Sequence, residues 1–172
     1  MSVEHSLLLL STKKSIFPSV ETAKCGQKPY PPLWIGGSHP AAVRRALRYG
    51  NGFFGAGRST TLQFAQQVQV LRAALAESAQ DPSSFQIAKR VYIAIDDSPH
   101  VHERVDAALG RIYGVSGLTP IAVYGSPSAY IAGLREVADA GAELIQLHLL
   151  FEDAEQMERL AAEVLCEMQN EQ

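Results

Sequence analysis

The order of apolar and polar residues predicts short strands that alternate with amphipathic helices. Leu33-Trp34-Ile35 is a short apolar run that Gly36-Gly37 closes, and residues of about 39–49 after it have helical spacing. Asn51-Gly52-Phe53-Phe54 predicts a second strand. The long helix that follows has its apolar residues on one face, at spacings of four, three and four: Phe64, Val68, Leu71 and Leu75.

A third strand is predicted further along the chain. From Phe85 to Ile95, apolar residues alternate with Lys89 and Arg90, which is typical of a strand. The stretch from Gly114 to Tyr124 has no clean period, so it is predicted to be a loop.

The end of the chain repeats the pattern of strand and helix. Ser126-Pro127 marks a helix start, and Leu144–Leu149 predicts the last strand. A final helix from about 153 to 168 is expected to turn four residues inward: Met157, Leu160, Val164 and Met168. Strands and helices that alternate in this way build a parallel sheet covered by helices, because their crossovers are right-handed.

The number of units limits the architecture to part of a barrel or a small open sheet. Only about four strand-helix units are visible, whereas a complete (β/α)8 barrel typically takes ~250 residues. The expected class is therefore α/β, with four to five parallel strands in an open sheet or a half TIM barrel. Residues 1–30 are expected to form a lead-in segment, and residues 31–172 a single domain.

Composition and charge exclude several classes of protein. The 172 residues are 47% hydrophobic and 19% charged, which excludes a disordered chain, a collagen and a disulfide scaffold. A formal net charge of -3 argues against nucleic acid or an anionic membrane as a partner. Cys25 and Cys166 lack metal-ligand spacing and suit a reducing cytoplasm, and the apolar run Leu7–Leu10 is too short for a leader or a membrane span.

Two glycine-rich segments are candidate phosphate sites. Gly36, Gly37 and Ser38 lie where a strand ends and a helix begins, and exposed amides with the positive end of a helix dipole attract phosphate there. The alternative is a capped tight turn without a ligand. The second segment also carries a guanidinium that can clamp phosphate oxygens or stay solvated: Gly55, Gly57, Arg58 and Ser59.

His148 is the candidate catalytic residue. It shares one face of the last strand with Leu144 and Gln146, and it would point to the mouth if that face lined a barrel. The alternative is a hydrogen-bonded core histidine. His100 and His102 have no carboxylate at ligand spacing, so no metal site is expected.

An ordered set of motifs resembles the bacterial luciferase-like flavin or deazaflavin oxidoreductases. The first motif is PPLWIGGSHP at 31–40 with AAVRRALRYGNGF at 41–53, followed by DPSSFQI at 81–87. GSP at 125–127 and AGAELI at 140–145 come next in the same order, so the resemblance spans roughly residues 28 to 165.

The resemblance implies a fold and a cofactor. Members of this family are TIM barrels that bind reduced FMN or coenzyme F420 at the barrel mouth, and this chain would correspond to strands five to eight, with the N-terminal barrel half absent. FMN is preferred here over F420. One departure is Asn51, where the family usually carries an acidic residue.

Two hypotheses of function follow. The first is an oxidoreductase module that binds reduced FMN, or F420, for monooxygenase or two-electron redox chemistry. The alternative is a non-catalytic half-barrel that binds a phosphate ligand or serves as a dimerising structural module. Because the strands are expected to be apolar on both faces or nearly so, a homodimer or larger homo-oligomer is predicted in either case. The substrate and the electron donor are not encoded in any motif.

Overall fold

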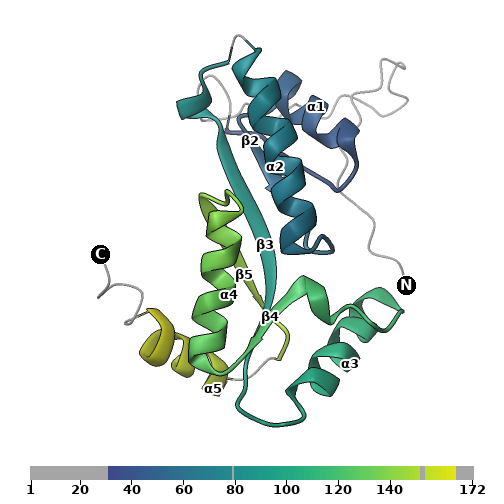
Figure 1. The fold of residues 1–172 in the computed structure, drawn as a ribbon, viewed down its shortest axis with the longest axis vertical. Coiled ribbons are helices and arrows are strands. Elements are labelled where there is room, and N and C mark those ends of the chain that lie inside the picture. The colour runs from purple at the N-terminus through teal and green to yellow at the C-terminus, as the bar shows by residue number, and fades with distance from the viewer. Residues whose placement is uncertain (1–30, 79, 152–153, 166–172) are drawn as a thin grey trace, which may run out of the picture. The chain divides into compact units, whose positions relative to one another are not determined.

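A parallel sheet organises the residues that the computed structural model describes, which are 31–78, 80–151 and 154–165 (Figure 1). Its strands are β1 (Trp34–Gly36), β2 (Gly52–Gly55), β3 (Gln86–Ile95), β4 (Ala122–Gly125) and β5 (Leu144–Leu149). The helices are α1 (Pro40–Tyr49), α2 (Thr61–Ala76), α3 (Val101–Tyr113), α4 (Pro127–Asp139) and α5 (Ala154–Arg159). The predicted lead-in, both cysteines and Met168 lie outside the described residues.

β3 is the strand against which three others pair. Its residues Gln86–Lys89 pair with β2, Tyr92–Ile95 pair with β4, and Ala88–Ile93 pair with β5. Because the β5 stretch overlaps both of the others, β2 and β4 share one edge of β3 and β5 takes the opposite edge. β1 pairs with β2. The prediction of four to five parallel strands with covering helices is confirmed.

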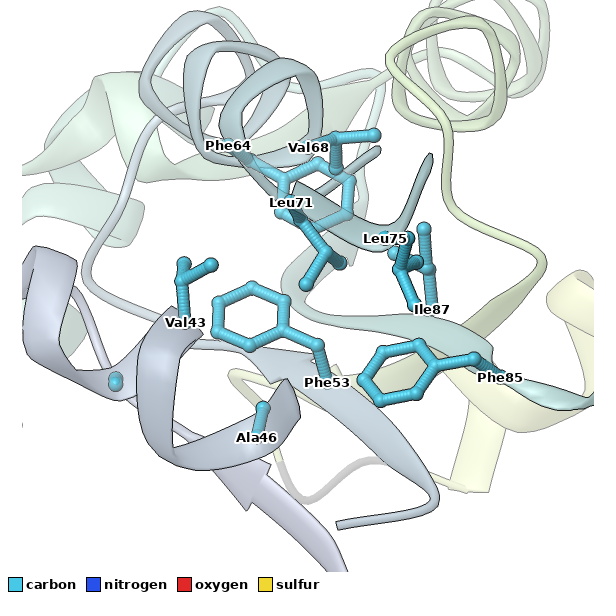
Figure 2. Close-up of a cluster of buried hydrophobic side chains, with 10 residues drawn as sticks. Val43, Ala46, Phe53, Phe64, Val68, Leu71, Leu75, Phe85 and Ile87 are labelled. Carbon is cyan, nitrogen blue, oxygen red and sulfur yellow. The ribbon is translucent and has the colours of Figure 1, made fainter. Parts of the chain in front are cut away.

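One face of the sheet, here called the outer face, packs against α1 and α2 to form a hydrophobic core. Phe53 of β2 and Ile87 of β3 are buried against this helix pair (Figure 2). The predicted stripe on α2 is confirmed, because all four of its residues are buried in the same cluster: Phe64, Val68, Leu71 and Leu75. Asn51 also ties β1 in place, since its Oδ1 accepts from the Leu33 amide at 3.0 Å.

The same outer face continues under α4. Val91 and Ile93 of β3 pack with Tyr130 and Leu134 of α4, and β5 adds its partly buried side chains. The other face, the inner face, is covered by α3, which packs over Tyr92 and Ala94 of β3 and over Ala122 and Tyr124 of β4. On β5, the inner-face residues are exposed, so the expectation of strands that are apolar on both faces is wrong there.

Two predictions about the strands are also corrected. Lys89 does not alternate with the apolar residues of β3: it lies on the same face as Ile87 and Val91 and is buried under α2, whereas Arg90 points to the opposite side. Part of the predicted loop at 114–124 is strand: Ala122–Gly125 forms β4, which is too short to show a period.

The last helix also differs from its prediction. α5 continues as a π-helical segment, η3 (Leu160–Leu165); Leu160 and Val164 are buried as predicted, but Met157 is exposed and Gln156 is buried. The Gln156 amide then bonds both the N–H and the C=O of Ile95, each at 3.2 Å, which satisfies backbone groups at the end of β3.

Lys89 holds the loop between β2 and α2. Its ammonium donates to the Ala56 carbonyl at 2.6 Å, to the Ser59 carbonyl at 2.9 Å and to the Ser59 hydroxyl at 3.2 Å. Burial, with a smaller contribution from the charge of Arg90, lowers the pKa of Lys89 to about 8. The loop therefore depends on a buried cation.

Substitution Lys89→Met should change how stability depends on pH. Because the pKa of Lys89 is lower in the folded state than in the unfolded state, the unfolded chain binds more protons between about pH 8 and 10.5. The free energy of unfolding of the unmodified protein should therefore rise across this window relative to Lys89→Met, by at most about 3 kcal/mol. Urea unfolding at several pH values measures it, and a constant difference between the two proteins would contradict the assignment.

The open inner face predicts self-association. Within the described residues, β1 and β5 each pair along one edge only, and exposed strand edges beside an uncovered face favour a partner. Light scattering at micromolar concentration should give at least twice the chain mass of 18.7 kDa. A mass of one chain under those conditions would refute the expectation.

Candidate functional site

A cavity of about 560 Å³ lies where β1 and β2 end and α1 and α2 begin. Its lining comes from both loops and from the facing sides of the two helices: Ser38, Pro40, Val43, Arg58, Ser59, Gln63, Gln66, Gln67 and Val70. Three residues predicted from two separate glycine-rich segments, Ser38, Arg58 and Ser59, thus meet at one cavity at the carboxyl end of the sheet.

Glycine is required in the loop after β1. A methyl carbon on Gly36 would lie 2.7 Å from the Phe54 carbonyl oxygen, and Gly37 has a φ of +145°. The cap of α1 is His39, whose Nδ1 accepts from the Ala41 amide at 3.1 Å. Among the described residues, no partner uses the Ser38 hydroxyl, which therefore stays available to a ligand at the cavity.

Gln67 of α2 fixes the same loop. Its Nε2 donates to the Ser38 carbonyl at 2.8 Å and to the Gly37 carbonyl at 3.4 Å. Its Oε1 is buried and accepts from none of the described residues. A buried acceptor without a donor is unfavourable by about 1–3 kcal/mol, so this oxygen is a candidate acceptor for a hydroxyl of a bound molecule.

Ser59 and Lys89 fix the loop between β2 and α2 by hydrogen bonds. Ser59 is buried, and its hydroxyl donates to the Ala56 carbonyl at 2.6 Å while accepting from Lys89. Thr60 and Gln63 then form a capping box at the start of α2. Ser59 therefore shapes the loop, and Arg58, which is exposed, is the side chain that the loop presents.

The two other glycines of this loop allow close packing. A methyl carbon on Gly55 would lie 2.6 Å from the Phe64 ring, and one on Gly57 would lie 2.6 Å from Nε of Arg90. Neither glycine lines the cavity. Glycine is needed at these two positions because the backbone passes too close to Phe64 of α2 and Arg90 of β3 for a side chain to fit.

His148 is not part of the cavity. It lies on the inner face of β5, paired in register with Tyr92, and the two rings meet edge to face with centroids 4.9 Å apart. His148 shares that face with Gln146 and is exposed, so the core-histidine alternative is wrong. His148 therefore lies apart from the cavity, on the inner face of the sheet.

Sequence reasoning did not find Gln67 and Lys89. A glutamine two turns into a helix carries no distinctive motif, and a lysine within a strand pattern is usually exposed. Among the described residues, no three His, Cys, Asp or Glu side chains gather as a metal site. No helix in the described part of the chain is both long and apolar enough to cross a membrane.

Comparisons with known structures agree with this fold. An F420-dependent secondary alcohol dehydrogenase bound to an F420-acetone adduct superposes with a TM-score of 0.60 at 14% identity, over 72% of this chain and 44% of that one. The coenzyme F420-dependent tetrahydromethanopterin reductase from Methanopyrus kandleri gives 0.58 at 16% identity, over 79% and 50%. EDTA monooxygenase from Chelativorans sp. BNC1 gives 0.60 at 13% identity, over 83% and 45%.

These likenesses show the fold, and this chain spans about half the length of each of these structures. No curated protein matches the sequence. The family model described as luciferase-like monooxygenase matches residues 14–164, which is most of the chain. The chain therefore belongs to the luciferase-like monooxygenase family.

Proposed function

We propose that this chain is the cofactor-binding part of an oxidoreductase that holds the phosphate of FMN, or of F420, between α1 and α2. The observation that carries the proposal is the convergence of Ser38 and Arg58 on one cavity from the ends of two adjacent strands. The similar structures include an F420-dependent secondary alcohol dehydrogenase and a riboflavin lyase with modified FMN, which supports a cofactor of this type.

The residues at the cavity fit such a group. The Ser38 hydroxyl provides a hydrogen-bond donor, the start of α1 provides the positive end of a helix dipole, and Arg58 provides the compensating charge. The buried Oε1 of Gln67 suits a hydroxyl of a polyol chain attached to the phosphate. When bound, the ring of FMN or F420 supplies the two-electron redox chemistry.

The chain's own residues would position that ring. Lys89 and Ser59 fix the loop that carries Arg58, while Gln67 fixes the loop that carries Ser38. Anchoring at the phosphate directs the rest of the cofactor toward the carboxyl end of the sheet, where enzymes with this kind of barrel place their chemistry. We retain His148 as the candidate catalytic residue because it lies near that end of β5.

The alternative remains a non-catalytic half-barrel that binds a phosphate ligand or joins two chains. It is favoured by one observation, namely that the candidate catalytic residue His148 does not line the cavity. The rate at which air reoxidises reduced FMN separates the two proposals. A catalytic module should change this rate, whereas a passive binder should leave it equal to that of free reduced FMN.

Substitutions at the cavity should weaken FMN binding. Because a charge-assisted hydrogen bond contributes about 1.5–3 kcal/mol, Arg58→Ala should raise the dissociation constant roughly tenfold or more, and Ser38→Ala by less. Arg45→Ala is the matched control, since Arg45 is exposed on α1 and lies outside the cavity. Fluorescence titration with FMN, and separately with F420, measures these constants.

Riboflavin provides the control for the phosphate itself. Since riboflavin lacks that group, its affinity should be lower than that of FMN and should not change in Arg58→Ala or Ser38→Ala. Equal affinity of the unmodified protein for FMN and riboflavin would show that both loops are ordinary turns. An effect of Arg45→Ala as large as that of Arg58→Ala would lead to the same conclusion.

A further inference from the structure

The cavity between α1 and α2 carries a single charged side chain. Of the described residues that line it, only Arg58 is ionised at neutral pH, and the others have hydroxyl, amide or apolar side chains. Lys89 does not line the cavity, and its ammonium already donates to oxygens of Ala56 and Ser59. The cavity therefore offers one full positive charge to an anion.

One guanidinium fits a phosphate with two ester bonds better than a phosphate with one. A phosphate with one ester bond carries a charge of about −1.5 to −2 at pH 7, because its second proton is lost near a pKa of ~6. A phosphate with two ester bonds has no second proton to lose and carries a single negative charge. Arg58 alone compensates the diester and leaves the monoester with excess negative charge.

The cavity is larger than a phosphate and continues beyond the phosphate contacts. Its volume of about 560 Å³ lies in the range of pockets that hold whole small molecules. Gln67 donates to the Ser38 carbonyl, which places the loop after β1 beside the middle of α2. Val70 lies almost one turn further along α2 and also lines the cavity. A phosphate between Ser38 and Arg58 thus leaves the end at Val70 for another part of the ligand.

The buried Oε1 of Gln67 needs a donor that a phosphate does not provide. This oxygen accepts from none of the described residues. The oxygens of an ionised phosphodiester only accept hydrogen bonds, so they cannot pair with it. A group esterified to the phosphate therefore also occupies the cavity and supplies the donor.

The end of the cavity at Val70 is uncharged and mostly apolar. Pro40 and Val43 of α1 and Val70 of α2 supply its apolar lining, and Gln66 adds a neutral amide. Val70 is exposed, so an apolar group bound at this end would remove its side chain from water. A charged group would lose its own hydration there without meeting an opposite charge. The group that fits this end is therefore uncharged.

We propose that the cavity binds a phosphodiester. One ester bond leads to the polyol and ring of the cofactor, and the other leads to an uncharged, largely apolar group that packs between Pro40, Val43 and Val70. This assignment rests on the proposed function, because it takes Ser38 and Arg58 as the phosphate contacts. It also goes further, since FMN is a monoester and leaves the apolar end of the cavity unfilled.

Fluorescence titration of the full chain with FMN, the butyl ester of FMN and the carboxypropyl ester of FMN tests the proposal. The butyl ester should bind roughly tenfold or more tightly than FMN, because each buried methylene favours binding by about fourfold. The carboxypropyl ester has a chain of similar length that ends in a carboxylate. It should bind no more tightly than FMN, because no cation apart from Arg58 lines the cavity.

Two matched variants of α2 locate the butyl group. Val70→Asn should reduce the ratio of butyl-ester affinity to FMN affinity to about one, whereas Val70→Leu should keep the ratio high. Leu62→Asn is the control, because Leu62 is also an exposed apolar residue of α2 but does not line the cavity. It should leave the ratio unchanged. Since Val70 and Leu62 are both exposed, these variants are expected to fold.

Three results would overturn the proposal. These are equal affinity for FMN and its butyl ester, tighter binding of the carboxypropyl ester than of the butyl ester, and an equal loss of the ratio in Leu62→Asn and Val70→Asn. Each of them leaves the proposed function intact as long as FMN binds more tightly than riboflavin. If FMN and riboflavin bind equally, the proposed function fails and the phosphodiester assignment fails with it.

Discussion

The opposite orientation of adjacent residues in β3 is the constraint on which the rest of the structure depends. Lys89 and Arg90 are neighbours in sequence, yet the pleat sends Lys89 under α2 and Arg90 to the inner face. The first cation fixes the loop that carries Arg58, and the second lies beneath Gly57 of that same loop. The loop between β2 and α2 therefore contacts side chains from both faces of β3.

β3 supports both the cavity between α1 and α2 and the inner face of the sheet. β3 pairs with β2 on one edge and with β5 on the other, so it positions the cavity-forming loop and His148 with respect to the same backbone. Because the loops after β1 and β2 are fixed by Gln67 and Lys89, Ser38 and Arg58 need little rearrangement to meet a ligand. On the inner face, by contrast, His148 is exposed, and Nε of Arg90 is buried without a partner among the described residues.

The parts of the fold that follow from periodicity could be predicted from the sequence. The stripe on α2, the two faces of β5 and the parallel order of strands all rest on spacing that repeats over several residues. β4 could not be predicted, because four residues are too few to show a period. The burial of Lys89 and Gln156 could not be predicted either, since it depends on carbonyl and amide groups far away in sequence.

Hydrogen exchange with and without FMN tests the central claim, that the ends of β1 and β2 together build a phosphate site. FMN should slow exchange of amides at residues 37–42 and 57–61. The start of α4 is an internal control, because Ser126 and Pro127 also begin a helix after a strand but lie outside the cavity. Protection confined to the first two segments is the predicted result. Equal protection at residues 126–130, or protection at neither of the first two segments, would contradict the account.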